Sequence, residues 1–281
     1  MRHYILKSAC IAGVVLLAAC SEDTSEVDRA LSDLNVIDET NLNEVMLNVA
    51  DPNEGVAHFQ RTLEANPDRI DIRRGLAISL IRAKRKTEAV LAWRSVTEHE
   101  ESVNDDFVHY ADALIRNNEW DAADEVLDTI PPTHETFKRY RLEAMIADSN
   151  ENWEKADSFY ETAVGLTTQP AGVLNNWGYS KLSRGDFAGA ERLFGDAVRR
   201  DSSLFTAKNN LVLARGAQKK YSLPVLETTQ VERAQLLYTL GLSAVKQGDT
   251  TIGKGLLRDA VDTHPQYFEA AARSLEALEN G

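Results

Sequence analysis

Residues 175–201 read NNWGYSKLSRGDFAGAERLFGDAVRRD, and this stretch decides the fold. It predicts a helix, a tight turn at Gly185-Asp186, a second helix and then Asp201. The same spacing returns over residues 237–265, LYTLGLSAVKQGDTTIGKGLLRDAVDTHP, where Gly248-Asp249 occupies the turn. A helix–turn–helix unit that recurs along a chain is typical of a repeat protein.

The period of about 34 residues extends over most of the chain. It places unit starts near Val36, Ile70, Asn104, Phe137, Ala171, Phe205 and Ala234. Position 8 of the unit is Ala or Gly at 77, 111, 144, 178 and 241, and position 20 is Ala or Gly at 55, 89, 123, 156, 190 and 253. Position 24 is large at Phe59, Trp93, Leu127, Tyr160, Phe194 and Leu257. Small residues let two helices cross closely, and large residues fill the groove beside them.

This pattern resembles the tetratricopeptide repeat. The resemblance implies an all-α fold, a superhelical solenoid of antiparallel helix pairs that spans residues 36–281. The expected units are 36–69, 70–103, 104–136, 137–170, 171–204, a degenerate unit at 205–233, and 234–267, followed by a capping helix over 268–279 that closes the open end of the stack.

Two units depart from the pattern. The first opens with a short helix over residues 42–49, which Asp51-Pro52 ends. The sixth has Pro224 where position 20 should be. Because proline inside a helix costs about 3 kcal/mol, we expect a loop in place of the second helix of this unit.

The first twenty residues, MRHYILKSACIAGVVLLAAC, indicate export. Arg2 and Lys7 precede an apolar stretch that is too short to span a bilayer, which predicts a signal peptide over residues 1–19. Residues 17–20, LAAC, resemble the lipobox of bacterial lipoproteins, which implies acylation, such as palmitate, on Cys20 after cleavage. The alternative is an ordinary signal peptide in which Cys20 is incidental. Residues 20–35 are acidic and poor in apolar side chains, and predict a solvated tether.

Composition excludes several classes of protein. The formal net charge is −13, and loss of residues 1–19 removes two basic and no acidic residues, giving −15. Such a charge argues against nucleic-acid binding and against adsorption to anionic lipid. Both cysteines lie within the first twenty residues, which excludes a disulfide scaffold or a cysteine-ligated metal in the folded region. No phosphate-binding loop, nucleophile elbow or paired histidine motif is present, so we expect no enzyme activity, no cofactor and no metal.

What remains is a binding surface. In tetratricopeptide proteins positions 2, 5, 6, 9, 12 and 13 of each first helix face a concave groove. The units from Ile70, Asn104 and Phe137 place charged residues there: Asp71, Arg74, Arg82, Asp105, Asp112, Arg116, Lys138 and Arg141. The units from Ala171, Phe205 and Ala234 place uncharged residues there: Asn175, Asn176, Tyr179, Leu182, Asn209, Asn210, Leu213, Tyr238, Leu242 and Val245.

We expect the uncharged half to bind a peptide. Asn176 and Asn210 share position 6 of consecutive units, and an amide side chain offers donors and an acceptor to an extended backbone. Tyr179 and Tyr238 would add rigid amphipathic contact area. The alternative is that the loop around Pro224 or the capping helix covers this face.

The lipobox, the acidic tether and the repeats, with residues 175–179 (NNWGY), 184–187 (RGDF) and 208–211 (KNNL), resemble the tetratricopeptide lipoprotein of the tight-adherence (Tad, Flp pilus) assembly system. The resemblance implies a lipid-anchored protein of the Gram-negative outer membrane, facing the periplasm, whose partners are the pilus secretin or other pilus-assembly components; Ser21 after the cysteine agrees with outer-membrane sorting. The alternatives are a pilotin-like lipoprotein of another type IV pilus or secretion system, and a scaffold for envelope or β-barrel assembly.

Overall fold

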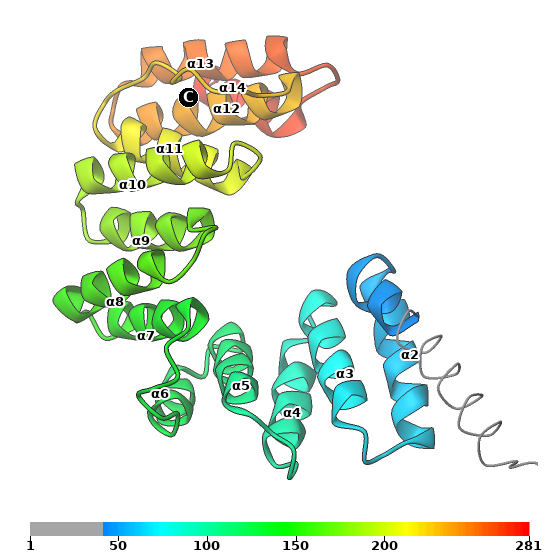
Figure 1. Cartoon of the computed structure of the whole chain (residues 1–281). Coiled ribbons are helices and arrows are strands. Elements are labelled where there is room, and N and C mark those ends of the chain that lie inside the picture. The colour runs from blue at the N-terminus through cyan, green and yellow to red at the C-terminus, as the bar shows by residue number, and fades with distance from the viewer. Residues whose placement is uncertain (1–41, 281) are drawn as a thin grey trace, which may run out of the picture.

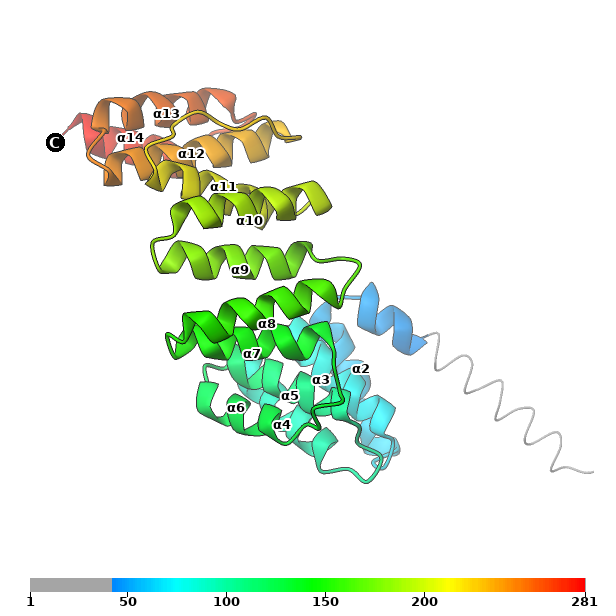
Figure 2. The same cartoon turned by 60° about the vertical axis from the view of Figure 1, so that its left-hand side comes forward.

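The computed structural model describes residues 42–280, and this part of the chain contains helices and no strand. The predicted signal peptide, Cys20 and the tether lie outside the described residues. Figure 1 shows the helices stacked side by side in one open arch, with α2 toward one end and α14 toward the other. Figure 2 shows that the stack also twists, since the first units pass behind α7 and α8 in that view. Within the described residues no helix has the length and apolarity needed to cross a membrane.

Consecutive helices pair in the order that the repeat predicts. Residues 42–48 are helical and precede α2 (Pro52–Ala65). The next pairs are α3 (Ile70–Arg82) with α4 (Lys86–Thr97), α5 (Asn104–Arg116) with α6 (Trp120–Asp128), α7 (Phe137–Ser149) with α8 (Trp153–Gly165), and α9 (Ala171–Ser183) with α10 (Phe187–Arg200). Then come α11 (Phe205–Ala217), the pair α12 (Gln230–Lys246) and α13 (Thr250–Thr263), and α14 (Glu269–Glu279). Residues 42–280 form an all-α solenoid of antiparallel helix pairs, the fold that the tetratricopeptide resemblance implies.

The small and large residues of the repeat interlock inside each pair. The six large residues at position 24 are all at most 2 % exposed: Phe59, Trp93, Leu127, Tyr160, Phe194 and Leu257. In the fifth unit a methyl group at Gly178 would lie 2.7 Å from the ring carbons of Phe194. The ring therefore occupies the space that a side chain at position 178 would need, and the two helices cross at this point.

Five helix pairs, from α3–α4 to α12–α13, turn through a residue in the left-handed region. Gly185 and Gly248 have φ of 82° and 84°, and Lys84, Asn118 and Glu151 hold the corresponding place with φ between 56° and 68°. Glycine adopts this conformation without steric cost, whereas the other residues are held there by the packing of the helices on either side. Lys219 has φ of 60° after α11, so the turn persists in the sixth unit although no second helix follows.

Charged residues of the first units form hydrogen bonds to neighbouring units of the array. Arg74 makes two 2.7 Å hydrogen bonds to Asp106, whose side chain is 4 % exposed and also accepts the backbone N–H of Val103. Arg82 donates to the carbonyl oxygens of Met46 and Ala50 at the end of the 42–48 helix. These bonds join one unit to the next and leave fewer free charges on this half of the groove than the sequence suggests.

Five other charged residues predicted on this half of the groove also contact polar side chains of the array. Asp112 accepts Arg116 at 2.8 Å and lies 3.7 Å from Arg141, and Lys138 lies 3.4 Å from the Nε2 atom of His109. Asp105 lies 3.0 Å from His134. Each of these contacts lies within one unit or between neighbouring units, so polar side chains cross-link this half of the array.

An ordered loop replaces the second helix of the sixth unit. Residues 221–229 contain no helix, and Leu223 and Leu226 insert into the apolar clusters around Val212, Leu236 and Leu240. Lys208, buried in α11, donates to the carbonyl oxygen of Glu227 at 2.7 Å and lies 3.4 Å from the carboxylate of Glu232. The loop thus occupies the place of the second helix of this unit. The buried Lys208 holds the loop in this position.

The last unit begins earlier than the sequence indicates. The spacing predicts a start near Ala234, but α12 begins at Gln230, because Thr229 and Glu232 form a capping box in which each side chain accepts the other's backbone N–H. The capping helix α14 begins at Glu269, and its Ala271 is fully buried beside Leu237 and Ala260. This contact covers the exposed end of the last pair.

Candidate functional site

The candidate site is a concavity on the first helices of units four to six, which we call the groove pocket. Its volume is about 520 Å³. Residues of α7, α9 and α11 supply most of its lining, and α6 and α8 add aromatic residues. The lining residues are Trp120, Met145, Asp148, Ser149, Trp153, Tyr160, Asn175, Asn176, Tyr179, Ser180, Ser183, Thr206 and Asn210.

Three amides predicted from the sequence meet in this pocket. The Nδ2 atom of Asn210 donates to the Oδ1 atom of Asn175 at 3.0 Å, so the amides of consecutive units are directly bonded. The Nδ2 atom of Asn176 lies 3.6 Å from the sulfur of Met145 in the preceding unit. All three side chains are half-buried, and each keeps hydrogen-bonding capacity that these contacts do not use.

A second concavity continues from the groove pocket, and we call it the side pocket. Its volume is about 360 Å³, and Tyr179 and Ser183 line both pockets. Leu182 and Leu213, also predicted from the sequence, line the side pocket. Tyr179 is 60 % exposed, so it stands at the rim where the two pockets meet. The two pockets are therefore neighbours along the first helices.

A buried polar cluster forms the base of the groove pocket. The hydroxyls of Tyr160 and Ser180, which are 1 % and 2 % exposed, donate to the carboxylate of Asp148 at 2.9 and 2.7 Å. Burial raises the pKa of Asp148, and these two hydrogen bonds offset the rise only in part. Tyr160 also stacks against Trp177, with ring centres 6.2 Å apart. The carboxylate is thus fixed in direction by two rigid donors.

A second carboxylate secures the helices behind this base. Asp157 of α8 accepts hydrogen bonds from Trp177 Nε1 and, at 2.8 Å, Lys181 of α9, and from Arg184, which directly follows α9. Burial acts to raise the pKa of Asp157, but the bonds from Lys181, Trp177 and Arg184 outweigh it and the pKa is lowered. The guanidinium of Arg184 lies 5.4 Å from the ring centre of Trp153, which places that ring at the pocket.

Four residues of the predicted groove lie apart from both pockets. Asn209 accepts the hydroxyl of Thr239 at 2.7 Å and so joins α11 to α12. Tyr238 packs on Phe268 with ring centres 5.4 Å apart, next to the capping helix. Leu242 is exposed and Val245 half-buried, and neither lines a pocket. We therefore confine the candidate site to Asn175, Asn176, Tyr179, Leu182, Asn210 and Leu213.

The expected alternative, a covered groove, applies to only part of this face. No residue of the loop 218–229 and none of α14 lines the groove pocket or the side pocket. Covering by the capping region is seen at Tyr238. The two pockets are therefore open to a ligand.

Several pocket residues are absent from the predicted site, although three of them occupy groove positions of the repeat. Met145, Asp148 and Ser149 occupy positions 9, 12 and 13 of the unit that begins at Phe137, which are groove positions. Trp120 and Trp153 begin second helices, and nothing in the repeat pattern places such residues on the groove.

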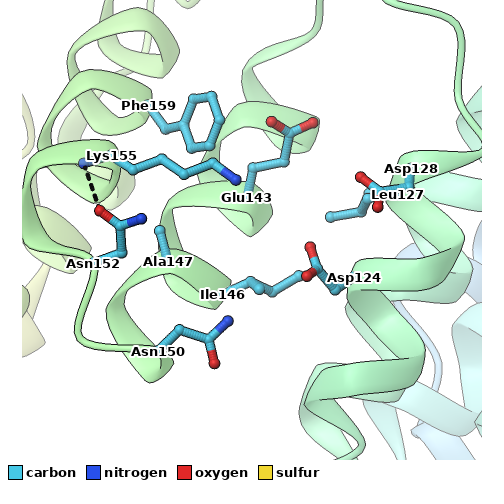
Figure 3. Close-up of a pocket in the computed structure, with 10 residues that line it drawn as sticks. All are labelled: Asp124, Leu127, Asp128, Glu143, Ile146, Ala147, Asn150, Asn152, Lys155 and Phe159. Carbon is cyan, nitrogen blue, oxygen red and sulfur yellow. Dashed lines mark hydrogen bonds between the residues drawn. The ribbon is translucent and has the colours of Figure 1, made fainter.

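A smaller concavity lies elsewhere, where α6, α7 and α8 meet. Figure 3 shows Lys155 extending beneath the ring of Phe159 toward Glu143, with Asp124 across the gap. The ammonium group is 5.4 Å from the ring centre, and the volume is only about 70 Å³. This volume is about a seventh of that of the groove pocket. Among residues 42–280 no group of three or more His, Cys, Asp or Glu side chains is arranged to hold a metal ion.

Comparisons with known proteins support the fold. The family model described as "Tetratricopeptide repeat" matches residues 47–96. No curated protein sequence matches the chain. Among solved structures the chain is similar to the APC/C hetero-tetramer Cut9–Hcn1, with 14 % identity, TM-score 0.59, and coverage of 84 % of this chain and 48 % of that one. The chain thus spans about half the length of that relative.

Two bacterial structures are covered more completely. A tetratricopeptide repeat protein from Parabacteroides merdae has 15 % identity and a TM-score of 0.51, with 92 % of this chain and 100 % of that chain covered. The pilF protein of Pseudomonas aeruginosa has 14 % identity and a TM-score of 0.51, with 74 % and 97 % covered. Identities this low show a shared fold and no more.

Proposed function

We propose that this protein is a non-enzymatic scaffold that binds an extended segment of a protein partner in the groove pocket and the side pocket. The single observation that carries the proposal is the row of amides at Asn175, Asn176 and Asn210 beside exposed Tyr179, in an open concavity of about 520 Å³. Tetratricopeptide repeats serve in general as surfaces for protein or peptide partners.

The amides suit a peptide backbone because each has one polar atom that forms no hydrogen bond within residues 42–280. Asn175 keeps its Nδ2 donor, and Asn176 and Asn210 keep their Oδ1 acceptors, since the contacts within residues 42–280 use the other atoms. An extended chain alternates N–H and C=O groups, and these free atoms would bond to it whatever its side chains are. Apolar side chains of the partner would then fill the side pocket beside Leu182 and Leu213.

A titration tests the groove directly. Peptides that bind the chain are first selected from a displayed library of random dodecamers, and affinities are then measured by fluorescence for the Asn176→Ala/Asn210→Ala variant. The proposal expects at least a tenfold loss of affinity, since two hydrogen bonds of about 1 kcal/mol each are removed. The control is Asn66→Ala/Asn280→Ala, two exposed residues that follow α2 and α14. Equal affinities in all three proteins would contradict the proposal.

We further propose a place for the scaffold in the cell. The LAAC sequence at residues 17–20 and the acidic stretch that follows support lipid attachment at Cys20 and a tethered body in the periplasm, at the outer membrane. The resemblance of residues 175–179 and 208–211 to the tight-adherence lipoprotein supports a role in assembly of the Flp pilus or placement of its secretin.

Two experiments separate these ideas. Labelling with radioactive palmitate should mark the wild-type protein and not Cys20→Ser, and equal labelling would remove the anchor from the proposal. Co-purification from solubilised membranes should recover a secretin or another pilus component. Recovery of the secretin of another pilus or secretion system would favour the pilotin-like alternative, and recovery of a barrel insertase would favour the envelope-assembly scaffold.

A further inference from the structure

We propose that the groove pocket selects for a basic side chain, lysine or arginine, in the bound segment, and that Asp148 is the carboxylate that recognises it. This inference rests on the proposed function and adds to it the chemistry of the ligand. It assigns a specificity-determining role to a half-buried acid whose contacts within residues 42–280 are the hydrogen bonds from Tyr160 and Ser180.

The first argument is charge. Asp148 is the only charged residue among those that line the groove pocket. Within residues 42–280 no cationic side chain lies within salt-bridge distance of it, whereas nearby Arg184 pairs with Asp157 and Arg141 lies 3.7 Å from Asp112. The positive charge of Arg184 acts on Asp148 only from beyond ion-pair distance. A partly buried carboxylate that forms no direct ion pair is costly to keep ionised. A cation supplied by a ligand would offset that cost.

The second argument is the orientation of the carboxylate. Tyr160 and Ser180 each donate one hydrogen bond to Asp148, one to each oxygen, and both donors are buried. Each carboxylate oxygen can accept a further bond, so two acceptor sites remain for an ammonium or guanidinium group. The two donors hold Asp148 in place before the ligand arrives, which lowers the entropy lost on binding.

The third argument is the remainder of the lining. Trp120, Met145 and Tyr179 line the same pocket as Asp148 and give it apolar and aromatic surface. Lysine and arginine carry long apolar stems below a charged head, and aromatic faces attract that head in addition. An acidic ligand would meet Asp148 with repulsion, and a small apolar side chain would leave the carboxylate buried and unpaired. Charge complementarity therefore selects a basic side chain over the other occupants.

The test combines selection with a double-mutant cycle on the full chain. Dodecapeptides selected on the wild-type protein should share a Lys or Arg at one fixed position. Affinity is then measured for the best peptide and its norleucine variant at that position, against wild type, Asp148→Asn and Asp128→Asn. The last is a control carboxylate that is exposed on α6, outside the groove pocket.

Asp148→Asn and the norleucine change should each weaken binding by about ten- to a hundredfold, and the two together by little more than either alone. Asp128→Asn should bind as wild type does. If Asp148→Asn fails to fold, Asp148→Ser takes its place in the cycle, and the norleucine peptide on wild-type protein still tests the need for a basic side chain.

The possible failures are distinct. Peptides that depend on Asn176 and Asn210 but share no basic residue, and bind Asp148→Asn unchanged, would overturn this inference and leave the proposed function standing. Basic peptides whose affinity is unchanged by substitution of Asn176, Asn210 and Asp148 would overturn both this inference and the proposed function. A selection that yields no peptide at all would do the same.

Discussion

The side-chain amide of Asn210 donates a 3.0 Å hydrogen bond to the side-chain amide of Asn175, one repeat away. This bond lies at the wall of the groove pocket and joins α9 to α11, so it serves the stack and the binding surface together. We expect Asn210→Ala to lower the free energy of unfolding by about 1 kcal/mol, the net value of one such bond. Urea denaturation followed by circular dichroism measures this. Asn280→Ala, on an exposed residue whose side chain makes no hydrogen bond within residues 42–280, is the control and should unfold as wild type does.

The crossing of α9 and α10 predicts a packing effect. In Gly178→Ala the new methyl would lie 2.7 Å from the buried ring of Phe194, and overpacking of this kind costs about 1–3 kcal/mol. In Gly255→Ala, within α13, the methyl would meet nothing within 4 Å, and the change should stabilise by about 0.5–1 kcal/mol. Melting temperatures of the two variants should shift in opposite directions. A shift in the same direction would contradict the packing described at Gly178.

The loop of the sixth unit should depend on one buried cation. Lys208→Met keeps the volume of the side chain but removes the bond to the Glu227 carbonyl and the contact with Glu232. We expect a loss of about 1–3 kcal/mol, as for a hydrogen bond to a charged group, and faster cleavage within residues 218–229 by proteinase K. Lys220→Met, which removes an exposed ion pair with Glu191, should cost under about 1 kcal/mol. Equal cleavage of both variants would show that Lys208 does not hold the loop.

His109 predicts a pH effect on stability. Its ring stacks on Trp93 with centres 4.9 Å apart, and burial, followed by the charge of Lys138, lowers the pKa of His109 below its ordinary value of 6.5. The neutral ring is favoured in the folded state, so its contribution is full above pH 6.5 and is lost as the pH falls through the lowered value. His109→Phe keeps the stack and should lose less stability than wild type on acidification.

The difference between wild type and His109→Phe isolates this histidine, because the carboxylates are common to both proteins. Denaturant unfolding between about pH 5 and 7 measures it. Lys138→Met, which removes the neighbouring charge, should show a smaller loss than wild type. Parallel pH curves for wild type and His109→Phe would contradict the assignment.

The repeat pattern predicted the fold because its recurring small and large residues lie where two helices cross, as Gly178 and Phe194 show. The starts of α3, α5, α7, α9 and α11 coincide with the expected unit starts. The start of α12 does not, because the period alone contains no capping information and Thr229 with Glu232 sets the boundary.

The groove was predictable only in part. Periodicity gives the direction of a side chain but not its partner, so Asn209 and Asn210 look equivalent, although Asn209 is bonded to Thr239 and Asn210 faces the pocket. Tyr238 was expected in the groove and instead packs on Phe268, a contact that depends on where the capping helix lies. Asp148 occupies a groove position of the repeat, but the sequence does not show that it is partly buried and held by Tyr160 and Ser180.

The most direct test of the central claim, that a partner segment lies in the groove pocket, is a site-specific cross-link. The photoreactive residue p-benzoylphenylalanine replaces either Tyr179, at the rim of both pockets, or Val225, fully exposed on the loop outside them. With a selected dodecapeptide, the account predicts a cross-linked product at position 179 and none at position 225. A product at position 225 with none at position 179 would place the partner elsewhere and contradict the account.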